Sequence, residues 1–245
     1  MQAQPNQVLE NNIRYFETRW NNLEPRQIFR AEAYILQKYL GHAHSARLHL
    51  TLADLGCGAG RITKHLHLLE GATVIGMDIA IEPLWRARSE NPSALFVRGS
   101  LAELPIATGA VDFCICAFNG LDYIYPAALR RQALVEMRRV LKPGGIVVFS
   151  SHNLWAYFTT FRILRLRSLW SYYTRRNGYL MEPNGLITYH ARRHGLLREV
   201  AAVGLQVLEV VNSDPGGWWR PWVFDPWLYY VCRLGSAAVI GAPAS

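Results

Sequence analysis

The chain has 245 residues, of which 51% are hydrophobic, and its formal net charge at pH 7 is +8. This length is enough for one large domain with a buried core, and no apolar run approaches the roughly 20 residues that a membrane-spanning helix needs. The polar segment 1–12 lacks the apolar centre of a signal peptide, so we expect a cytoplasmic protein with a single domain over residues 1–245.

A glycine-rich turn follows the first predicted strand. Residues 8–20 and 31–40 are expected to form two helices, and the apolar strand after them runs into Gly56, Gly58 and Gly60. Glycine permits positive φ angles and the close approach of a ligand, and the N–H groups of a helix starting near Gly60 would point at that ligand. A dinucleotide-binding turn reads Gly-x-Gly-x-x-Gly, whereas this one reads Asp-x-Gly-x-Gly-x-Gly from Asp54.

The second predicted strand, over residues 72–78, ends in an acid. Asp78 lies 20 positions beyond Gly58, and in doubly wound folds an acid at about that distance from the turn accepts hydrogen bonds from ribose hydroxyls. A solvated aspartate at a strand end is the alternative. Ile79 follows directly and could pack on one face of a base.

The segments after Asp78 continue the alternation of strands and helices. Apolar strands are expected over residues 110–117 and 146–150, without the polar alternation of a half-exposed strand, as in parallel strands covered on both faces. Between them, apolar residues recur at helical spacing after Pro126, and the run 142–145 (Lys-Pro-Gly-Gly) ends the helix. Strands alternating with helices indicate a doubly wound sheet.

These motifs, in this order over residues 50–150, resemble those of the class I S-adenosylmethionine-dependent methyltransferases. The resemblance implies an α/β, Rossmann-like, doubly wound, seven-stranded sheet that is mostly parallel, with an antiparallel last strand, N-terminal helices and a helical insertion after strand five. It also implies S-adenosyl-L-methionine as the cofactor. The contacts it implies are Asp54, Gly56, Cys57, Gly58 and Gly60 in the turn, Asp78 at the ribose, Ile79, Ser100 and Leu101 at the adenine, and Asn119 at the methionine end.

One of these positions departs from the family pattern. Where this chain has Ser100, the family usually carries an acid that accepts a hydrogen bond from the adenine amino group. A serine hydroxyl accepts more weakly than a carboxylate. The backbone N–H of Leu101 is therefore the safer expected contact with the adenine.

The resemblance divides the domain into four parts: N-terminal helices (1–48), a cofactor-binding core (49–153), a helical lid insertion (154–187) and a C-terminal helix and hairpin (188–245). In related enzymes N-terminal helices fold over the cofactor, which makes Tyr15, Phe16 and Trp20 candidate lid residues; packing of this helix on the sheet edge is the alternative. Residues 189–202 are expected to form the helix before the hairpin, with strands over 204–211 and 227–233. The tryptophans of residues 218–222 could cover the sheet or line the acceptor site.

The insertion is rich in arginine and aromatic residues. From residue 152 to 193 there are seven arginines and one acid, Glu182, which gives +6 of the chain's formal +8. Three interpretations stay open: a helix that completes the core, a lid that attracts an anionic or aromatic small molecule, and a contact with RNA or with a membrane surface.

Candidate catalytic residues lie just past the predicted strands. His152 follows strand five and His190 ends the insertion, and the usual pKa of histidine suits it to take a proton from an acceptor. Asp122 follows strand four and could face the acceptor or cap the loop before Pro126. For both histidines a hydrogen-bonded structural role is the alternative.

The four cysteines are expected to be buried thiols. Cys114 and Cys116 alternate along one apolar strand, but no histidine or acid is spaced to complete a tetrahedral site with them. No metal is therefore expected.

The predicted function is methyl transfer to a small-molecule acceptor at an oxygen, nitrogen or carbon atom. An RNA methyltransferase that uses the arginine-rich insertion is the alternative within enzymes, and a catalytically silent, cofactor-binding partner protein is the alternative of another class. A nicotinamide-dependent oxidoreductase fits less well because of the glycine spacing.

Overall fold

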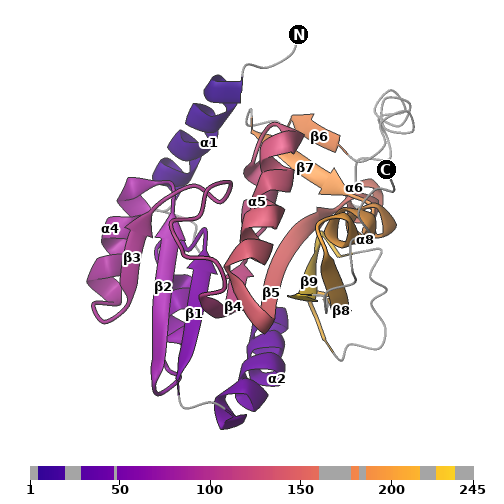
Figure 1. The fold of residues 1–245 in the computed structure, drawn as a ribbon. Helices are drawn as coiled ribbons and strands as arrows, with labels where there is room; N and C mark the ends of the chain where they lie inside the picture. The colour runs from indigo at the N-terminus through magenta and orange to yellow at the C-terminus, as the bar shows by residue number, and fades with distance from the viewer. Residues whose placement is uncertain are drawn as a thin grey trace, which may run out of the picture.

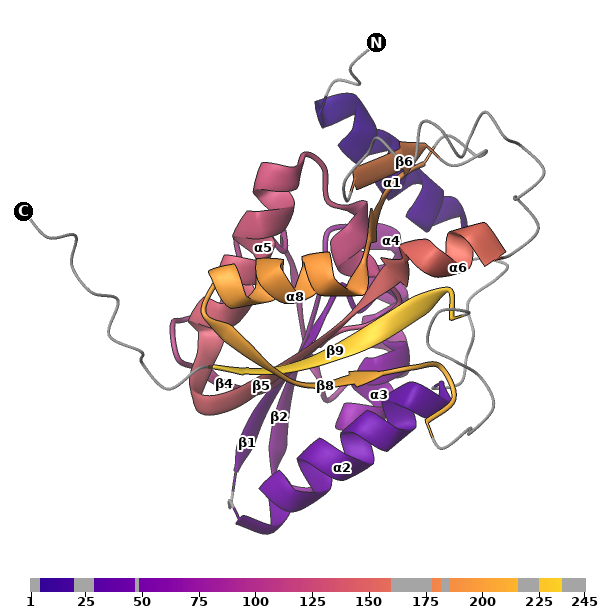
Figure 2. The ribbon, with the colours of Figure 1, turned by 90° about the vertical axis from the view of Figure 1, so that its right-hand side faces the viewer.

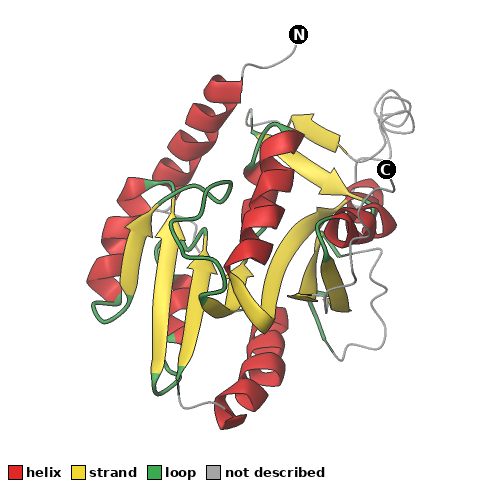
Figure 3. Cartoon of the chain, in the orientation of Figure 1, coloured by secondary structure: helices red, strands yellow, loops and turns green. Residues whose placement is uncertain are grey.

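The computed structural model describes residues 5–19, 29–46, 49–159, 178–181, 186–215 and 225–234. In this part of the chain one sheet of nine strands is flanked by helices (Figures 1 and 3). The strands are β1 (Leu50–Leu55), β2 (Ala72–Asp78), β3 (Leu95–Arg98), β4 (Val111–Cys116), β5 (Leu141–Asn153), β6 (Gly178–Met181), β7 (Ile187–Ala191), β8 (Leu205–Val211) and β9 (Trp227–Leu234).

The helices connect these strands and precede them. They are α1 (Pro5–Arg19), α2 (Arg30–Ala46), α3 (Arg61–Leu66), α4 (Ile81–Glu90), the 3-10 turn η1 (Gly120–Tyr123), α5 (Ala127–Val140), α6 (Leu154–Thr159) and α8 (Arg193–Ala202). Pro126 stands just before α5, and α5 ends two residues before the Lys-Pro-Gly-Gly run, as the sequence predicts. Within these described segments, no helix is both long and apolar enough to pass through a bilayer.

The sheet has the predicted mixed topology. Strands β3, β2, β1, β4 and β5 are parallel neighbours in that order. β9 then pairs antiparallel with β5, and β8 pairs antiparallel with β9. The predicted doubly wound sheet with an antiparallel last strand is thus confirmed, and the carboxyl ends of β1, β2 and β4 meet at one edge. The number of strands differs from the predicted seven, because the hairpin β6–β7 adds two strands to this sheet.

Helices cover both faces of the sheet, which is why the central strands are apolar throughout. All six residues of β4 are buried. Phe113 and Ile115 pack in the core on the side of α2 and α3, and Cys114 and Cys116 pack in the core on the side of α5 and α8, because successive side chains of a strand point to opposite faces. Figure 2 shows these two helix layers.

The segment after β5 differs from the predicted helical insertion. Residues 154–159 form the short helix α6, but residues 178–181 and 187–191 form the hairpin β6–β7. The expected helix over residues 189–202 is therefore wrong at its start, and α8 begins at Arg193. The predicted lid over residues 160–177 lies outside the described residues.

Long-range pairing with β5 explains this difference. β5 continues past the end of β4, whose last residue Cys116 pairs with Phe149. The end of β5 that extends beyond β4 pairs with β7 instead, with His152 opposite His190 and Asn153 opposite Ala191. Residues 187–191 are all buried, Thr188 and His190 included, although apolar and polar residues alternate along them as in a half-buried strand.

A buried ion pair joins α2 to the start of α3. Glu32 has a fully buried side chain, and Arg61 is only 7% exposed. The two groups form a bidentate pair, with Arg61 Nη2 at 2.9 Å from Glu32 Oε1. The Tyr229 hydroxyl and the backbone N–H of Phe29 also donate to this carboxylate, each at 2.9 Å. A carboxylate with all of these donors is fully satisfied, so the pair ties α2, α3 and β9 together.

Glu32→Ala should lower the free energy of unfolding by about 3–5 kcal/mol, because it leaves the Arg61 guanidinium buried without its partner. The free energy can be measured by urea denaturation. Glu90→Ala is the matched control: its pair with Arg86 is exposed, and its loss should cost less than about 1 kcal/mol. Equal effects of the two substitutions would contradict the structural role given to Glu32.

Candidate functional site

The glycine turn lies between β1 and α3, at the carboxyl edge of the sheet. Gly56, Gly58 and Gly60 have φ angles of 72°, 54° and 84°, a region that side chains with a Cβ rarely adopt. A Cβ added at Gly60 would lie 2.8 Å from the Asn91 side chain, so this glycine lets the start of α3 pack against α4. A Cβ added at Gly56 would meet no atom within 4 Å. Gly56 therefore borders open space, where a ligand can approach the backbone.

Backbone hydrogen bonds hold the turn against the end of β2. The N–H groups of Gly56 and Cys57 donate to the carbonyl oxygen of Met77 at 2.7 and 2.8 Å. The N–H of Gly58 donates to Asp78 Oδ2 at 2.8 Å, and that of Ala80 to Asp78 Oδ1 at 2.9 Å. Burial raises the pKa of Asp78, while these two donors oppose the rise. Each carboxylate oxygen keeps a lone pair for a further donor.

Asp54 lies beneath the turn. Its Oδ2 accepts hydrogen bonds from the Thr63 N–H at 2.8 Å and the Thr63 hydroxyl at 2.7 Å, which fixes the first turn of α3. The side chain is buried, and this burial raises the pKa of Asp54 to about 6.

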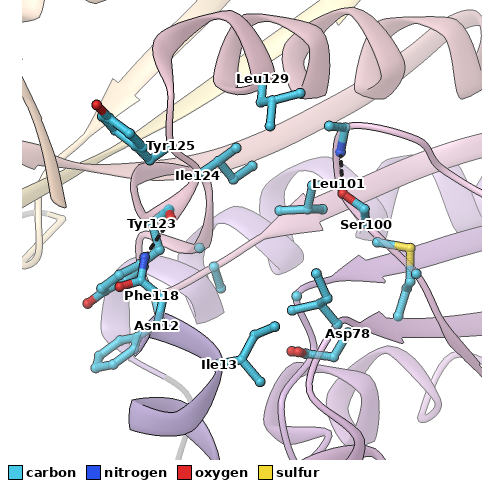
Figure 4. Close-up of a pocket in the computed structure, with 17 residues that line it drawn as sticks. Asn12, Ile13, Asp78, Ser100, Leu101, Phe118, Tyr123, Ile124, Tyr125 and Leu129 are labelled. Carbon is cyan, nitrogen blue, oxygen red and sulfur yellow. Dashed lines mark hydrogen bonds between the residues drawn. The ribbon is translucent and has the colours of Figure 1, made fainter. Parts of the chain in front are cut away.

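A cavity of about 200 Å³ opens above the turn. Figure 4 shows Asp78, Ser100 and Leu101 on one side of it, and Asn12, Phe118 and Tyr123 on the other. Asp78 is the one charged residue among the described residues that line it. The lining residues are Asn12, Ile13, Gly56, Met77, Asp78, Ile79, Gly99, Ser100, Leu101, Ala102, Ala117, Phe118, Gly120, Tyr123, Ile124, Tyr125 and Leu129.

The structure divides the predicted cofactor residues into two groups. Those that line the cavity are Gly56, Asp78, Ile79, Ser100 and Leu101. Those that are not among its lining residues are Asp54, Cys57, Gly58, Gly60 and Asn119. Among the second group, Gly58 acts on the cavity through Asp78. The hydroxyl of Ser100, the residue that departs from the family pattern, accepts the Ala102 N–H at 3.2 Å.

Asn119 combines an unusual backbone with an unsatisfied side chain. Phe118 and Asn119 have φ angles of 54° and 60°, and the Asn119 N–H donates to the Ser150 hydroxyl at 2.7 Å. The Oδ1 atom of Asn119 is buried and has no hydrogen-bond partner among the described residues. A buried acceptor without a donor is costly, and the two chain neighbours of Asn119, Phe118 and Gly120, line the cavity.

The candidate catalytic residues Asp122 and His152 form a hydrogen-bonded pair. Asp122 Oδ2 lies 3.0 Å from His152 Nδ1 and accepts the His152 backbone N–H at 2.6 Å. The Asp122 side chain is fully buried, whereas that of His152 is 20% exposed. The Asp122 carboxylate therefore binds the ring and the backbone of His152, and it does not cap the loop before Pro126.

His190 lies against His152, because β7 pairs with the end of β5. The two rings stack with their centroids 4.8 Å apart. His190 is buried, and its Nε2 lies 3.0 Å from the Thr188 hydroxyl. His152 is thus the more accessible of the two histidines.

Sequence reasoning missed several residues of the site. Asn12 and Ile13 bring α1 to the cavity, and Asn12 Nδ2 donates to the Tyr123 carbonyl at 2.8 Å. No sequence signal distinguishes Asn12 from other polar residues of the helix. Tyr15, the predicted lid residue, is not among the lining residues; the Phe16 side chain and Trp20 lie outside the described residues, as do residues 218–222.

A second missed group surrounds Asp122. Arg130 of α5 lies 3.4 Å from Asp122 and 2.5 Å from Glu199, over the ring of Tyr189 at 3.8 Å. These residues come from η1, α5, α8 and β7, so their meeting depends on the tertiary fold. Among the described residues no three histidine, cysteine or acidic side chains are grouped so that they could hold a metal ion.

Comparison with known proteins relates the core of the chain to one family. Residues 52–145 match the model of a methyltransferase domain. The chain is 34% identical over 112 residues to a malonyl-acyl-carrier-protein O-methyltransferase of Yersinia pestis, a match that covers 46% of this chain and 39% of that protein. The chain spans about two fifths of the length of the curated relatives it matches.

Solved structures extend the similarity to nearly the whole chain. The 1,6-didemethyltoxoflavin-N1-methyltransferase of Burkholderia thailandensis, with its substrate and S-adenosylhomocysteine bound, has a TM-score of 0.68 at 16% identity and covers 96% of this chain and 92% of its own. The cyclase SpnF has a TM-score of 0.61 at 15% identity and covers 94% of this chain and 95% of its own. At such identities the similarity concerns the fold, which does not by itself determine the reaction.

Asp54→Asn should change how stability depends on pH. The raised pKa means that ionised Asp54 is disfavoured in the folded state, so the stability contributed by its protonated form is present below pH 3.8 and lost as the pH rises to about 6. Asparagine does not titrate. The unfolding free energy of the variant minus that of the wild type should therefore rise by up to about 3 kcal/mol over this interval. Urea denaturation at several pH values measures it, and a difference that stays flat would contradict the effect of burial.

Proposed function

Because residues 52–145 belong to the methyltransferase-domain family and the fold is that of S-adenosylmethionine-dependent methyltransferases, we propose that this chain transfers a methyl group from S-adenosylmethionine to a small-molecule acceptor. The observation that carries the proposal is the cavity that joins the open backbone at Gly56 to the half-buried carboxylate of Asp78. No other ionised side chain among the described lining residues competes with this carboxylate for a ligand.

The residues of the cavity suggest which group holds each part of the cofactor. We assign Asp78 to the ribose hydroxyls, because its carboxylate is fixed by two backbone donors and can still accept. Ile79, Ser100 and Leu101 lie at the same side of the cavity and would contact the adenine. The Asn119 Oδ1 atom can accept a hydrogen bond from the amino group of the methionine part.

In methyl transfer the main task of the protein is to position the cofactor and the acceptor relative to each other. The cofactor supplies a sulfonium methyl group, which an acceptor lone pair attacks in line. Holding the reacting atoms about 3–3.5 Å apart and aligned can supply roughly 7–11 kcal/mol of the barrier. Apolar side chains of the cavity, among them Ile13, Ile124 and Leu129, would exclude water from the reacting atoms.

RNA methylation is the second candidate, since it would draw on the arginines of residues 154–187. Most of that segment lies outside the described residues. An RNA acceptor predicts binding that weakens steeply as the salt concentration rises. A silent, cofactor-binding protein is the third candidate, and it predicts cofactor binding without turnover.

Calorimetry and a labelled-methyl assay test the proposed function. We expect the protein to bind S-adenosylmethionine and S-adenosylhomocysteine but not nicotinamide dinucleotides, and to transfer label into the small-molecule fraction of a cell extract. Label in the RNA fraction would favour the second candidate. Tight cofactor binding with no labelled product would favour a silent partner, and no cofactor binding would reject the proposal.

Asp78→Ala should weaken binding of S-adenosylhomocysteine by about 1–3 kcal/mol, since it removes charge-assisted hydrogen bonds. Affinity of the wild type should also weaken on acidification, beginning at a higher pH than for an ordinary aspartate, because the pKa of Asp78 is raised. Calorimetry measures both effects. Glu82→Ala makes the same change at an exposed position of α4 and should leave the affinity unchanged. An Asp78→Ala protein that is folded by circular dichroism and binds normally would remove Asp78 from the ribose site.

A further inference from the structure

Asn12 of α1 brings an unsatisfied hydrogen-bond acceptor to the wall of the cavity. Asn12 lines the cavity, although the residue is only 3% exposed. Its Nδ2 atom donates to the Tyr123 carbonyl at 2.8 Å, whereas its Oδ1 atom is buried and has no hydrogen-bond partner among the described residues. A buried acceptor in this state costs free energy, and at a cavity it points to a ligand that donates a hydrogen bond.

The orientation of the Asn12 amide is fixed by its partner. A carbonyl oxygen can only accept a hydrogen bond, so the amide turns its nitrogen toward Tyr123 and keeps its oxygen for another group. Rotation of the amide by half a turn would place two acceptors against each other and would break the hydrogen bond to Tyr123. Asn12 therefore offers an acceptor, and not a donor, to a ligand in the cavity.

The Tyr123 carbonyl is itself held in place, because the next carbonyl along the chain is bound by another element. The Tyr179 hydroxyl of β6 donates to the Ile124 carbonyl at 2.6 Å. The rings of Tyr125 and Tyr179 meet edge-on, with their centroids 5.0 Å apart. Tyr123, Ile124 and Tyr125 all line the cavity, so the wall that positions Asn12 is fastened both to α1 and to the hairpin β6–β7.

A second unsatisfied acceptor lies at the start of the same turn. The Asn119 Oδ1 atom is buried without a hydrogen-bond partner among the described residues, and Asn119 directly precedes η1, whose last residue is Tyr123. A 3-10 turn rises about 2 Å per residue, so the backbones of Asn119 and Tyr123 lie within about 8 Å of each other. One buried amide oxygen at each end of this short turn gives this side of the site an excess of acceptors.

The donor groups of the cofactor can be separated by their positions. Figure 4 shows Asp78, Ser100 and Leu101 across the cavity from Asn12, and these are the residues assigned above to the ribose and the adenine. The remaining donor of S-adenosylmethionine is the ammonium group of its methionine part. An ammonium group has three N–H donors and needs acceptors wherever water is excluded. Asn12 and Asn119 can supply them.

We propose that Asn12 is a cofactor-binding residue whose Oδ1 atom accepts a hydrogen bond from the ammonium group of the methionine part. This inference rests on the proposed function. The hydrogen bond adds to the one assigned to Asn119, and it joins α1 to the ligand as well as to Tyr123. Hydrogen bonds to charged groups are stronger than those between neutral groups, so the retention of the cofactor depends on α1.

A cycle that combines a change in the protein with a change in the ligand tests this contact. The ligands are S-adenosylhomocysteine and its desamino analogue, 5′-S-(3-carboxypropyl)-5′-thioadenosine, in which hydrogen replaces the amino group. The protein variant is Asn12→Leu, which keeps the approximate size of the side chain and removes both of its polar atoms. Calorimetry on the wild type and the variant measures the four dissociation constants, from which the coupling between residue and amino group follows.

Loss of the amino group should weaken binding to the wild type by at least about tenfold, one decade corresponding to 1.4 kcal/mol. The same loss should weaken binding to Asn12→Leu at least about fivefold less than it does in the wild type, because the contact is already absent. A residue that only anchors α1 would affect both ligands alike. An equal loss of affinity in the two proteins would therefore overturn the proposal.

Two further variants separate the contact from packing effects. Asn12→Ala repeats the cycle with a small side chain that favours a helix, so the result does not depend on how leucine packs. Asn12→Asp keeps an oxygen at this position and should keep the preference for the ligand with the amino group, whereas loss of that preference would contradict the assignment. Asn11→Leu, the same change at the neighbouring exposed position of α1, should leave both dissociation constants unchanged.

The wild type by itself separates this inference from the proposed function. Equal affinity of the wild type for the two ligands would reject the ammonium contact and leave the proposed function intact. Binding of neither ligand would remove the proposed function, and the role of Asn12 with it.

Discussion

The hydrogen bond from the Gly58 N–H to the Asp78 carboxylate is the contact on which the rest of the site depends. It fastens the turn after β1 to the end of β2, together with the two N–H groups that share the Met77 carbonyl. The turn can approach β2 this closely only because its glycines adopt positive φ angles. As a result, the backbone of Gly56 and the Asp78 carboxylate, whose orientation is fixed, together form one edge of the cavity.

Buried charges hold the surrounding elements in place. Glu32 and Arg61 tie α2 to the helix that follows the turn, and Tyr229 adds β9 to the same carboxylate. Asp54 holds the first turn of that helix through Thr63. Each of these carboxylates is buried with its donors in contact, the condition under which a buried charge is tolerated. The turn is consequently supported from β1, α2 and α3 as well as from β2.

The cluster around Asp122 and His152 is held by a different feature, a strand that extends past its neighbour. β5 runs past the end of β4, and the residues of β5 beyond that point pair with β7. This pairing stacks His190 on His152 and brings Tyr189 under Arg130, which reaches Asp122 and Glu199. The glycine turn and Asp78 depend on contacts within residues 50–80, whereas this cluster depends on residues after β5. The loop after β4 lies between the two groups, and its residues Phe118 and Asn119 adopt positive φ angles.

The sequence by itself determined the strand order of the core, the turn and Asp78, because these features are local: a glycine pattern, an apolar run and an acid at a strand end. It also placed His152 and Asp122 at strand ends, although not in contact. Only the tertiary structure decided that residues 187–191 form a fully buried strand, since this burial depends on pairing with β6 and with the end of β5, which lies more than 30 residues earlier in the chain. It also decided that Asn12 lines the cavity beside Tyr123, 111 positions away, and that Arg130 joins Asp122 to Glu199, 69 positions away, because such distant residues meet only when the chain folds.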